Sequence, residues 1–318
     1  MNVFLIIALT ATGGADDRPC VVVVVGAPGA PEYSGEFRRW ADLWQSAATG
    51  ASAGSIRIGL GDEGGTTDRE RLRLALAGRT SAGPGPTWLV LIGHGSYDGR
   101  EGKFNLRGPD VTDADLAGWL APISGPVAVL DCTSSSGTFL TRLSGPGRVV
   151  VTATRSGSEQ NFARFGQYLA ESIADPAADL DKDGQVSLLE AYLTASRRVA
   201  EFYKTRSRLA TEHALLDDNG DQLGTPADWF RGVRATRKAK DNATPDGARA
   251  HQFCLVPNDR ERAMPADARR RRDELELAVA ALRDGKAKLA EDDYYRKLEG
   301  LMVELARIYG GTQPGHEH

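Results

Sequence analysis

Short apolar runs bounded by Gly and Pro recur through the first half of the sequence, and segments with helical periodicity alternate with them. The segments that we expect to form strands are the runs at residues 20–25, 88–92, 127–130 and 148–154, together with residues 55–60, where apolar and other residues alternate. Runs that are apolar throughout are typical of parallel strands buried on both faces. Strands that alternate with helices indicate a sheet covered on both sides. The sequence therefore predicts an α/β fold, a three-layer α/β/α sandwich with a mainly parallel sheet.

The 318 residues suffice for one large core and an appendage. We expect the core domain to span residues 20–230, followed by a basic linker over 231–266 that contains Pro and Gly. Two amphipathic segments within 267–310 predict an antiparallel helical hairpin. The hairpin is a candidate surface for a protein partner. The net charge of −4 argues against a nucleic-acid partner.

Residues 1–19 resemble a secretory signal, because an apolar run at 3–9 is followed by small residues. No basic residue precedes the run, so a buried first strand is the alternative. No other stretch approaches the roughly 18 apolar residues of a membrane span. We expect an exported protein, periplasmic or extracellular, and a cytoplasmic location stays open. Export would permit a bridge between Cys20 and Cys254, and unpaired thiols are the alternative.

Two of the apolar runs end in reactive side chains. His94 follows the run 88–92, and Cys132 follows the run 127–130. The carboxyl ends of neighbouring parallel strands meet at one edge of a sheet, so we expect the imidazole and the thiol side by side. That is the geometry of a thiol nucleophile and its base. A helix that starts near Gly137 would lower the pKa of the thiol.

Residues 179–190 match the twelve-residue calcium loop of EF-hands. The expected ligands of Ca²⁺ are Asp179, Asp181, Asp183, Gln185 through its carbonyl, Ser187 and Glu190. The segment before the loop is a poor helix, so we expect a calcium loop without an entering helix, and an acidic turn without metal is the alternative. A weaker second loop offers Asp217, Asn219 and Asp221, with an ion site and a plain turn equally open. No pattern indicates an organic cofactor.

Strand-Gly-His-Gly, then strand-Asp-Cys with Ser and Gly following, resembles the caspase–legumain clan of cysteine peptidases over residues 20–175. The match is closest to legumain-like and glycosylphosphatidylinositol-transamidase-like members and their bacterial relatives, whose acidic tail is similar to residues 211–221. The resemblance implies a caspase-like fold that hydrolyses peptide bonds. On that basis His94 would be the acid/base, Cys132 the nucleophile and the amide of Gly95 an oxyanion donor.

The sequence after the second reactive strand departs from the family pattern Asp-x-Cys-x-Ser-Gly. Counted from Asp131, the Cys position holds Thr133, and counted back from Gly137 it holds Ser134. A shift of one residue turns a strand side chain to the opposite face, so Cys132 could instead be structural. Three hypotheses follow: Cys132 is the nucleophile, Ser134 takes that position, or the protein is a catalytically degenerate homologue that serves as a calcium-binding interaction or scaffold module.

The family resemblance also places a substrate pocket after the strand beyond the Cys. The expected pocket residues are Arg155, Ser156, Ser158 and Glu159. Glu159 with a serine would suit an amide or basic side chain, and Arg155 an acidic one. The alternative is a turn that only caps the next helix. The predicted function is that of a calcium-stabilised cysteine endopeptidase acting on peptide or protein substrates, with the degenerate interaction module as the alternative.

Overall fold

The computed structural model describes residues 18–311 except 62–63, 81–82, 84, 239 and 241–242. The predicted secretory signal lies almost wholly outside the described residues. Within the described part of the chain, no helix has the length and apolar character needed to cross a membrane.

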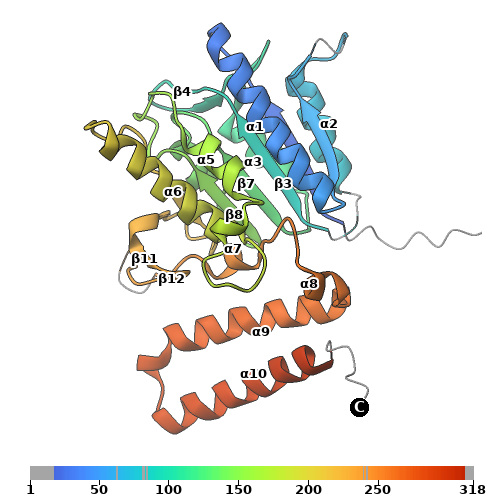
Figure 1. The fold of residues 1–318 in the computed structure, drawn as a ribbon, viewed down its shortest axis with the longest axis vertical. Coiled ribbons are helices and arrows are strands. Elements are labelled where there is room, and N and C mark those ends of the chain that lie inside the picture. Colours follow the sequence, from blue (N-terminus) through green and yellow to red (C-terminus); the bar gives the residue numbers. More distant parts are fainter. Residues whose placement is uncertain are drawn as a thin grey trace, which may run out of the picture.

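A seven-stranded sheet in the order β10-β9-β8-β7-β3-β1-β2 forms the centre of the protein (Figure 1). Its five parallel strands are β1 (Cys20–Val25), β2 (Gly54–Ile58), β3 (Thr87–Ile92), β7 (Val127–Asp131) and β8 (Arg148–Thr152). Every residue of β1, β3 and β7 is buried, and apart from Thr87 and Asp131 at the strand ends these residues are apolar, as expected of parallel strands covered on both faces. The predicted mainly parallel sheet is confirmed.

Helices cover both faces of the sheet, as predicted, because alternate strand residues point to opposite sides. One face packs against α1 (Pro31–Gly50), α5 (Phe165–Ser172) and α6 (Leu188–Thr205). The other packs against α2 (Asp68–Thr80), α3 (Asp113–Leu120) and α4 (Gly137–Leu143). A short 3-10 helix, η1 (Pro176–Ala178), precedes the acidic loop. The three-layer α/β/α sandwich is therefore confirmed.

Several short strands lie outside the predicted set. The strands β9 (Leu215–Asp217) and β10 (Thr225–Pro226) extend the sheet in the antiparallel sense beyond β8. A separate three-stranded sheet contains β4 (Gly95–Tyr97), β5 (Gly102–Phe104) and β6 (Val111–Thr112). Strands of two or three residues are too short to show an alternating pattern, so periodicity does not reveal them.

The expected linker over residues 231–266 is wrong, because much of this segment is folded onto the domain. It contains β12 (Arg234–Ala235), α7 (Ala248–Gln252) and α8 (Asp259–Ala263), and β11 (Phe230–Arg231) and η2 (Ala227–Trp229) lie at its start. Ala250, Phe253 and Leu255 are buried in the same core as the sheet. Three apolar residues at irregular spacing give no helical or strand period, which is why composition alone suggested a linker.

The predicted helical hairpin is confirmed. It consists of α9 (Ala266–Asp284), the short η3 (Lys286–Lys288) and α10 (Glu291–Gly311), and it lies beneath the sheet domain (Figure 1). Leu275, Val279 and Leu305 form its small apolar core. The hairpin contacts α7, where the side-chain Nε2 of Gln252 donates to the backbone carbonyl oxygen of Asp273 over 2.9 Å. Cys20 and Cys254 are both free thiols, so no disulfide joins them. The backbone of Cys254 forms an isolated β-bridge with Ser187.

Candidate functional site at the carboxyl edge of the sheet

His94 lies at the point where the chain leaves the sheet in opposite directions from two neighbouring strands. After β1 the chain enters α1 on one face, and after β3 it continues to α3 on the other. Ligands of open α/β sheets bind at such a switch point. The ring Nε2 of His94 lies 3.0 Å from the carbonyl oxygen of Pro28, in the loop after β1. Because a carbonyl oxygen can only accept, Nε2 donates in this hydrogen bond, and Nδ1 is then the acceptor nitrogen of the neutral ring.

Aromatic rings surround the imidazole of His94. The ring centroids of Tyr33, Phe37 and Phe162 lie 5.0, 5.4 and 6.1 Å from that of His94. The contacts of Pro28 and Phe162 with His94 were not predicted from the sequence. The rule that loops after adjacent strands share one edge could have indicated Pro28, but nothing in the local sequence marks Phe162.

Cys132 lies in the layer between the sheet and its helices, not at the open edge. The thiol is only 1% exposed, and its side chain packs beneath Gly166 of α5. The backbone N–H of Cys132 donates to the carbonyl of Leu91 over 3.0 Å, so the ladder with β3 continues one residue past β7. Cys132 is thereby held opposite the end of β3, below the level of His94. Burial and the adjacent carboxylate of Asp131 raise the pKa of the thiol.

The thiol and the imidazole form no hydrogen bond with each other among the described residues. The contact recorded for the sulfur of Cys132 leads to the carbonyl of Leu130, at 3.8 Å. A reactive cysteine requires a thiolate in a partly exposed, electropositive surrounding. The buried position of Cys132 agrees with the hypothesis that this residue is structural. The hypothesis that Cys132 is the nucleophile stays a prediction.

The side chain of Ser134 forms hydrogen bonds with both backbone polar groups of Gly95, the residue expected to supply an oxyanion donor. The amide of Gly95 donates to the Ser134 hydroxyl oxygen over 3.2 Å, and the hydroxyl donates to the carbonyl of Gly95 over 3.1 Å. With 3% exposure, Ser134 is also shielded from water. The amide that would bind an oxyanion is therefore already satisfied by a side chain.

Thr133, which holds the family's Cys position when counted from Asp131, is fully buried. Its hydroxyl and its amide both donate to the same carboxylate oxygen of Asp131, at 2.6 and 3.1 Å. Burial raises the pKa of Asp131 to about 6, although these two hydrogen bonds act in the opposite direction. The hydroxyl of Thr133 is therefore fixed by Asp131 in a turn.

The predicted pocket residues form a loop that is joined to the end of β7. The amide of Ser135 donates to the carbonyl of Glu159 over 2.8 Å. The carboxylate of Glu159 accepts from the amide and the Nε of Arg155, each at 3.1 Å. The amide and Nδ1 of His213 also contact it, at 3.1 and 2.6 Å. The hydroxyls of Ser156 and Ser158 lie 2.8 Å apart.

Glu159 is therefore surrounded by donors, which leaves it poorly placed to receive a basic or amide side chain. The side chain of its partner His213 is 40% exposed and bound to Glu159. The adjacent Glu212, which is buried, accepts from the amides of Arg164 and Phe165 at the start of α5. Residues 211–213 thus connect the pocket loop to α5.

The acidic loop 179–190 brings three of its carboxylates close together. Asp179, Asp181 and Asp183 each place a carboxylate oxygen within 4.8 Å of the others. The turn at its centre has positive φ at Lys182 (65°) and Gly184 (90°), and only the latter residue adopts this conformation without strain. Burial raises the pKa of Asp183, and the carboxylates of Asp181 and Glu190 add to the effect. Converging carboxylates of this kind fit a hard divalent cation.

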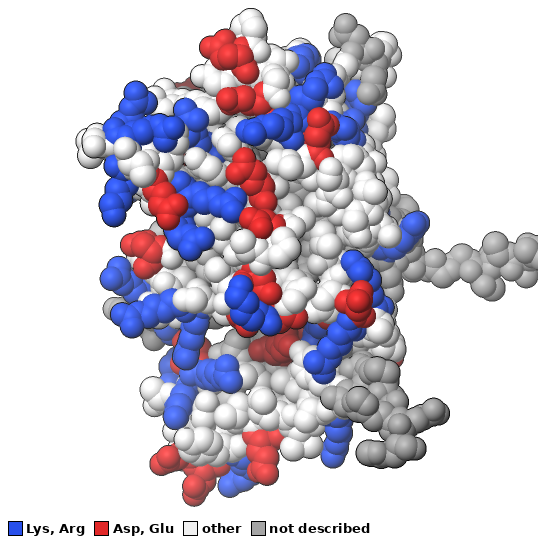
Figure 2. Space-filling model, in the orientation of Figure 1, with Lys and Arg blue, Asp and Glu red and all other residues white. Residues whose placement is uncertain are grey.

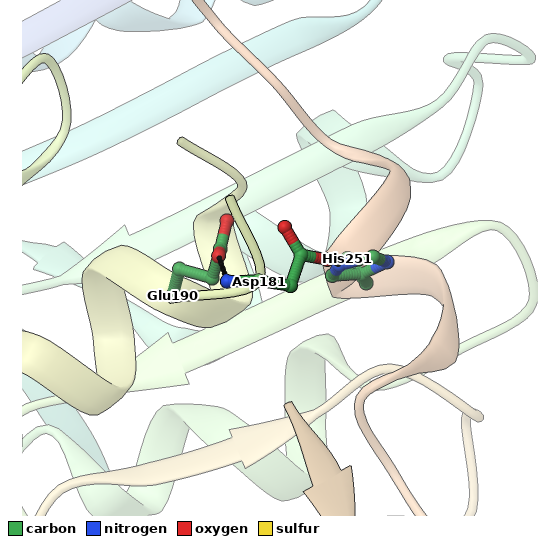
Figure 3. Close-up of side chains that lie close together, drawn as sticks. All are labelled: Asp181, Glu190 and His251. Carbon is green, nitrogen blue, oxygen red and sulfur yellow. Dashed lines mark hydrogen bonds and ion pairs between the residues drawn. The ribbon is translucent and has the colours of Figure 1, made fainter. Parts of the chain in front are cut away.

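Glu190 closes the loop from its far end (Figure 3). Its carboxylate accepts from the amides of Leu180 and Asp181, at 2.7 and 3.2 Å, and it forms a capping box with Ser187. His251 of α7 approaches from outside the motif and lies 2.9 Å from a carboxylate oxygen of Asp181. Ca²⁺ bound here would be held by Asp179, Asp181, Asp183, the carbonyl of Gln185 and Glu190. Ser187 is buried as a helix cap.

The second acidic loop has the hydrogen bonds of a tight turn. Asp217 accepts from the amide of Gly220, and Asn219 accepts from the amide of Asp221, at 2.9 and 2.8 Å. The carboxylate of Asp221 in turn accepts from the amide of Leu223. These side chains satisfy the backbone of the loop, as Asx turns do. A second ion at Asp217, Asn219 and Asp221 stays a prediction.

No family model matches the sequence, and no curated protein matches it either. Among solved structures, the initiator caspase Dronc from Drosophila is similar, with a TM-score of 0.45 and 14% identity over 65% of this chain and 82% of that one. Caspase-1 from Spodoptera frugiperda is similar with a TM-score of 0.41 and 10% identity, over 64% of this chain and 87% of the other. Similarity at this level does not extend to activity or to the roles of residues.

Proposed function

We propose that this chain is a caspase-like, calcium-stabilised protein that binds peptide segments at the carboxyl edge of its sheet and does not use Cys132 as a nucleophile. The observation that argues against Cys132 as a nucleophile is its position, 1% exposed beneath α5. Thiolate formation there is opposed by burial and by Asp131.

Alkylation with iodoacetamide at neutral pH, followed by peptide mapping, tests this proposal. We expect Cys132 to react no faster than Cys20, which is also buried, and the rate to be unchanged in His94→Ala. Fast alkylation of Cys132 that disappears in His94→Ala would instead establish a thiolate–imidazole pair. That result would overturn the proposal in favour of a peptidase.

One observation favours a cysteine endopeptidase as the second candidate. The hydrogen bond from Nε2 to the carbonyl of Pro28 orients the ring of His94 and makes Nδ1 the acceptor nitrogen of the neutral imidazole, as a general base requires. Activity would require the turn after β7 to rearrange so that a nucleophile reaches this nitrogen. Hydrolysis of a mixed peptide library that is abolished in both His94→Ala and Cys132→Ala would support this candidate.

Ca²⁺ at residues 179–190 is the second part of the proposal. An ion that binds only the folded state stabilises it by about 2.7 kcal/mol at a hundredfold excess over Kd. The thermal midpoint should therefore rise when CaCl₂ is added to chelator-treated protein. An unchanged midpoint at millimolar CaCl₂ would remove the calcium assignment and leave the peptide-binding assignment untouched. Export, and a protein partner at the helical hairpin, stay predictions.

A further inference from the structure

The side chain of His251 brings a nitrogen ligand to the acidic loop. Its ring Nε2 lies 2.9 Å from a carboxylate oxygen of Asp181. One ligand atom each of His251, Asp181 and Glu190 lies within 4.8 Å of the other two. Figure 3 shows Asp181 between the other two side chains, which come from α6 and α7. The cluster therefore combines one imidazole with two carboxylates from three separate parts of the chain.

Contacts outside the loop hold His251 in this place. The amide of Ala250 donates to a carboxylate oxygen of Asp218 over 2.8 Å, and the amide of His251 donates to the carbonyl of Gly247 over 2.9 Å. Ala250 is fully buried, so α7 is anchored in the core of the sheet domain. The position of the imidazole is thus set before any ion binds, which reduces the cost of assembling a site.

The ligand atoms of this cluster suit a transition metal better than calcium. Ca²⁺ takes oxygen ligands, whereas imidazole nitrogen suits Zn²⁺ and similar transition-metal ions. Zinc sites that keep a position for water combine three protein ligands, and these include imidazole nitrogen and carboxylate oxygen. With bonds of about 2.0–2.2 Å in a tetrahedron, the ligand atoms lie roughly 3.3–3.6 Å apart. Atoms within 4.8 Å of one another reach this spacing by small rotations of the side chains.

Two of the three ligands are accessible to water. The side chains of His251 and Asp181 are 35% and 30% exposed, whereas Glu190 is 1% exposed. An ion can therefore enter from the surface and keep a water ligand. It would replace the proton on Nε2, and the neutral ring would carry its proton on Nδ1. The longest hydrogen bond that the Glu190 carboxylate accepts, at 3.2 Å from the amide of Asp181, is the one that an ion replaces most readily.

The attraction of a cation to this cluster would be local. Acidic and basic side chains are interspersed over the face of the protein in Figure 2, so that face presents no broad acidic surface that would collect cations of every kind. The choice of ion then depends on the ligand atoms and their spacing, which is the basis on which proteins select among divalent metals.

We propose that Asp181, Glu190 and His251 form a site for Zn²⁺ or a similar transition-metal ion, with water completing the coordination. The site shares Asp181 and Glu190 with the calcium loop, so Zn²⁺ and Ca²⁺ compete for it. Asp179 and Asp183 are ligands for Ca²⁺ alone, and His251 is a ligand for the transition metal alone. The inference goes beyond the proposed function and does not depend on peptide binding or on Cys132.

Isothermal titration calorimetry of the chelator-treated full chain with ZnCl₂, and separately with CaCl₂, tests the site. We expect His251→Ala to weaken zinc binding by at least roughly tenfold, because loss of even an outer-shell partner costs that much. His251→Gln removes the imidazole but keeps a donor for Asp181, and it should show the same loss. Calcium binding should be unchanged in both variants. Thermal melts without metal verify that each variant is folded.

Two further variants separate this site from other metal binding. Asp183→Asn should weaken calcium binding and leave zinc binding unchanged, because Asp183 is not part of the cluster with His251. His213→Ala is the matched control. The Nδ1 of His213 also lies close to a carboxylate, 2.6 Å from Glu159, but among the described residues this pair belongs to no group of three potential metal ligands. His213→Ala should bind zinc as the original protein does.

Zinc binding that is unchanged in both His251 variants, or that falls equally in His213→Ala, would overturn the site. Absence of zinc binding in the original protein would do the same. If the His251 variants lose calcium binding together with zinc binding, His251 supports the loop as a whole, and its assignment to a transition metal is overturned. Absence of calcium binding in the original protein, with zinc binding that depends on His251, would support the site and instead remove calcium from the proposed function.

Discussion

The ring of Phe253 lies edge-on against the ring of Trp88, with 5.6 Å between their centroids. Trp88 belongs to the central strand β3, whereas Phe253 comes from the segment after α7, far along the chain. Both side chains are buried. This contact makes the later segment a part of the sheet domain and places the start of the helical hairpin against it.

Phe253→Ala is therefore expected to destabilise the whole domain. Removal of a buried phenylalanine side chain costs about 3–5 kcal/mol, as a sum of lost transfer energy and a cavity. Urea denaturation followed by tryptophan fluorescence measures the change. Leu209→Ala is the control, because Leu209 is 91% exposed and should have no effect. Equal midpoints for the two variants would contradict the integration of this segment.

Gly166→Ala should destabilise the protein through the packing around the thiol. A Cβ at Gly166 would lie 2.6 Å from the Cβ of Cys132 and 3.2 Å from the ring of Trp40. Overpacking of this kind costs about 1–3 kcal/mol. Gly35→Ala on α1 meets no neighbouring atom and should instead stabilise by a few tenths of a kcal/mol to about 1, through helix propensity. The two variants should thus shift the urea midpoint in opposite directions, and a neutral Gly166→Ala would contradict the burial of Cys132.

Asp183→Asn should separate calcium binding from the intrinsic stability of the acidic loop. The variant removes one ligand of Ca²⁺, so most of the calcium-dependent rise in thermal midpoint should disappear. Without calcium it should be at least as stable as the original protein, because the neighbouring carboxylates of Asp181 and Glu190 no longer repel a charge. Asp221→Asn in the second loop is the control for the calcium response. A full calcium response in Asp183→Asn would place the ion elsewhere.

The buried acid Asp246 should make stability depend on pH. Burial, together with the carboxylate of Asp218, raises the pKa of Asp246 to about 8, compared with about 3.9 in an unfolded chain. Below pH 4 both states hold the proton. Between about pH 4 and 8 the unfolded state releases it while the folded state keeps it, so the free energy of unfolding falls as pH rises.

Asp246→Asn leaves a neutral group at this position, so its stability should fall less than that of the original protein between about pH 5 and 8.5. Urea midpoints at the two pH values measure the difference. Asp267→Asn, at an exposed position, should keep the original pH dependence. If both variants lose stability with pH as the original protein does, Asp246 ionises normally in the folded state.

The long elements of the fold could be predicted because each leaves a periodic pattern. The apolar strands, the capping box of Thr112 and Asp115 on α3, and both helices of the hairpin follow from local sequence. The short strands and the segment around Phe253 could not be predicted, because their apolar residues are few and irregularly spaced. They are held by contacts with distant residues, which a single sequence does not display.

The candidate site, too, could be predicted only in part. The edge of the sheet and the placement of His94 there could be derived from the strand pattern. The orientation of Cys132 could not, since a shift of one residue along a strand reverses the face to which a side chain points. The roles of Pro28 and His213 depend on loops that only the folded chain brings together.

The pair of hydrogen bonds that joins Ser134 to Gly95, here called the seal, contributes little free energy. It consists of two neutral hydrogen bonds, each of which contributes about 0.5–1.5 kcal/mol net. A ligand of micromolar affinity gains about 8 kcal/mol on binding, several times what the seal holds. A peptide carbonyl placed at the amide of Gly95 would replace one of these bonds with its own. The hydrogen bonds between Ser134 and Gly95 therefore describe the state without ligand, and binding of a ligand can replace them.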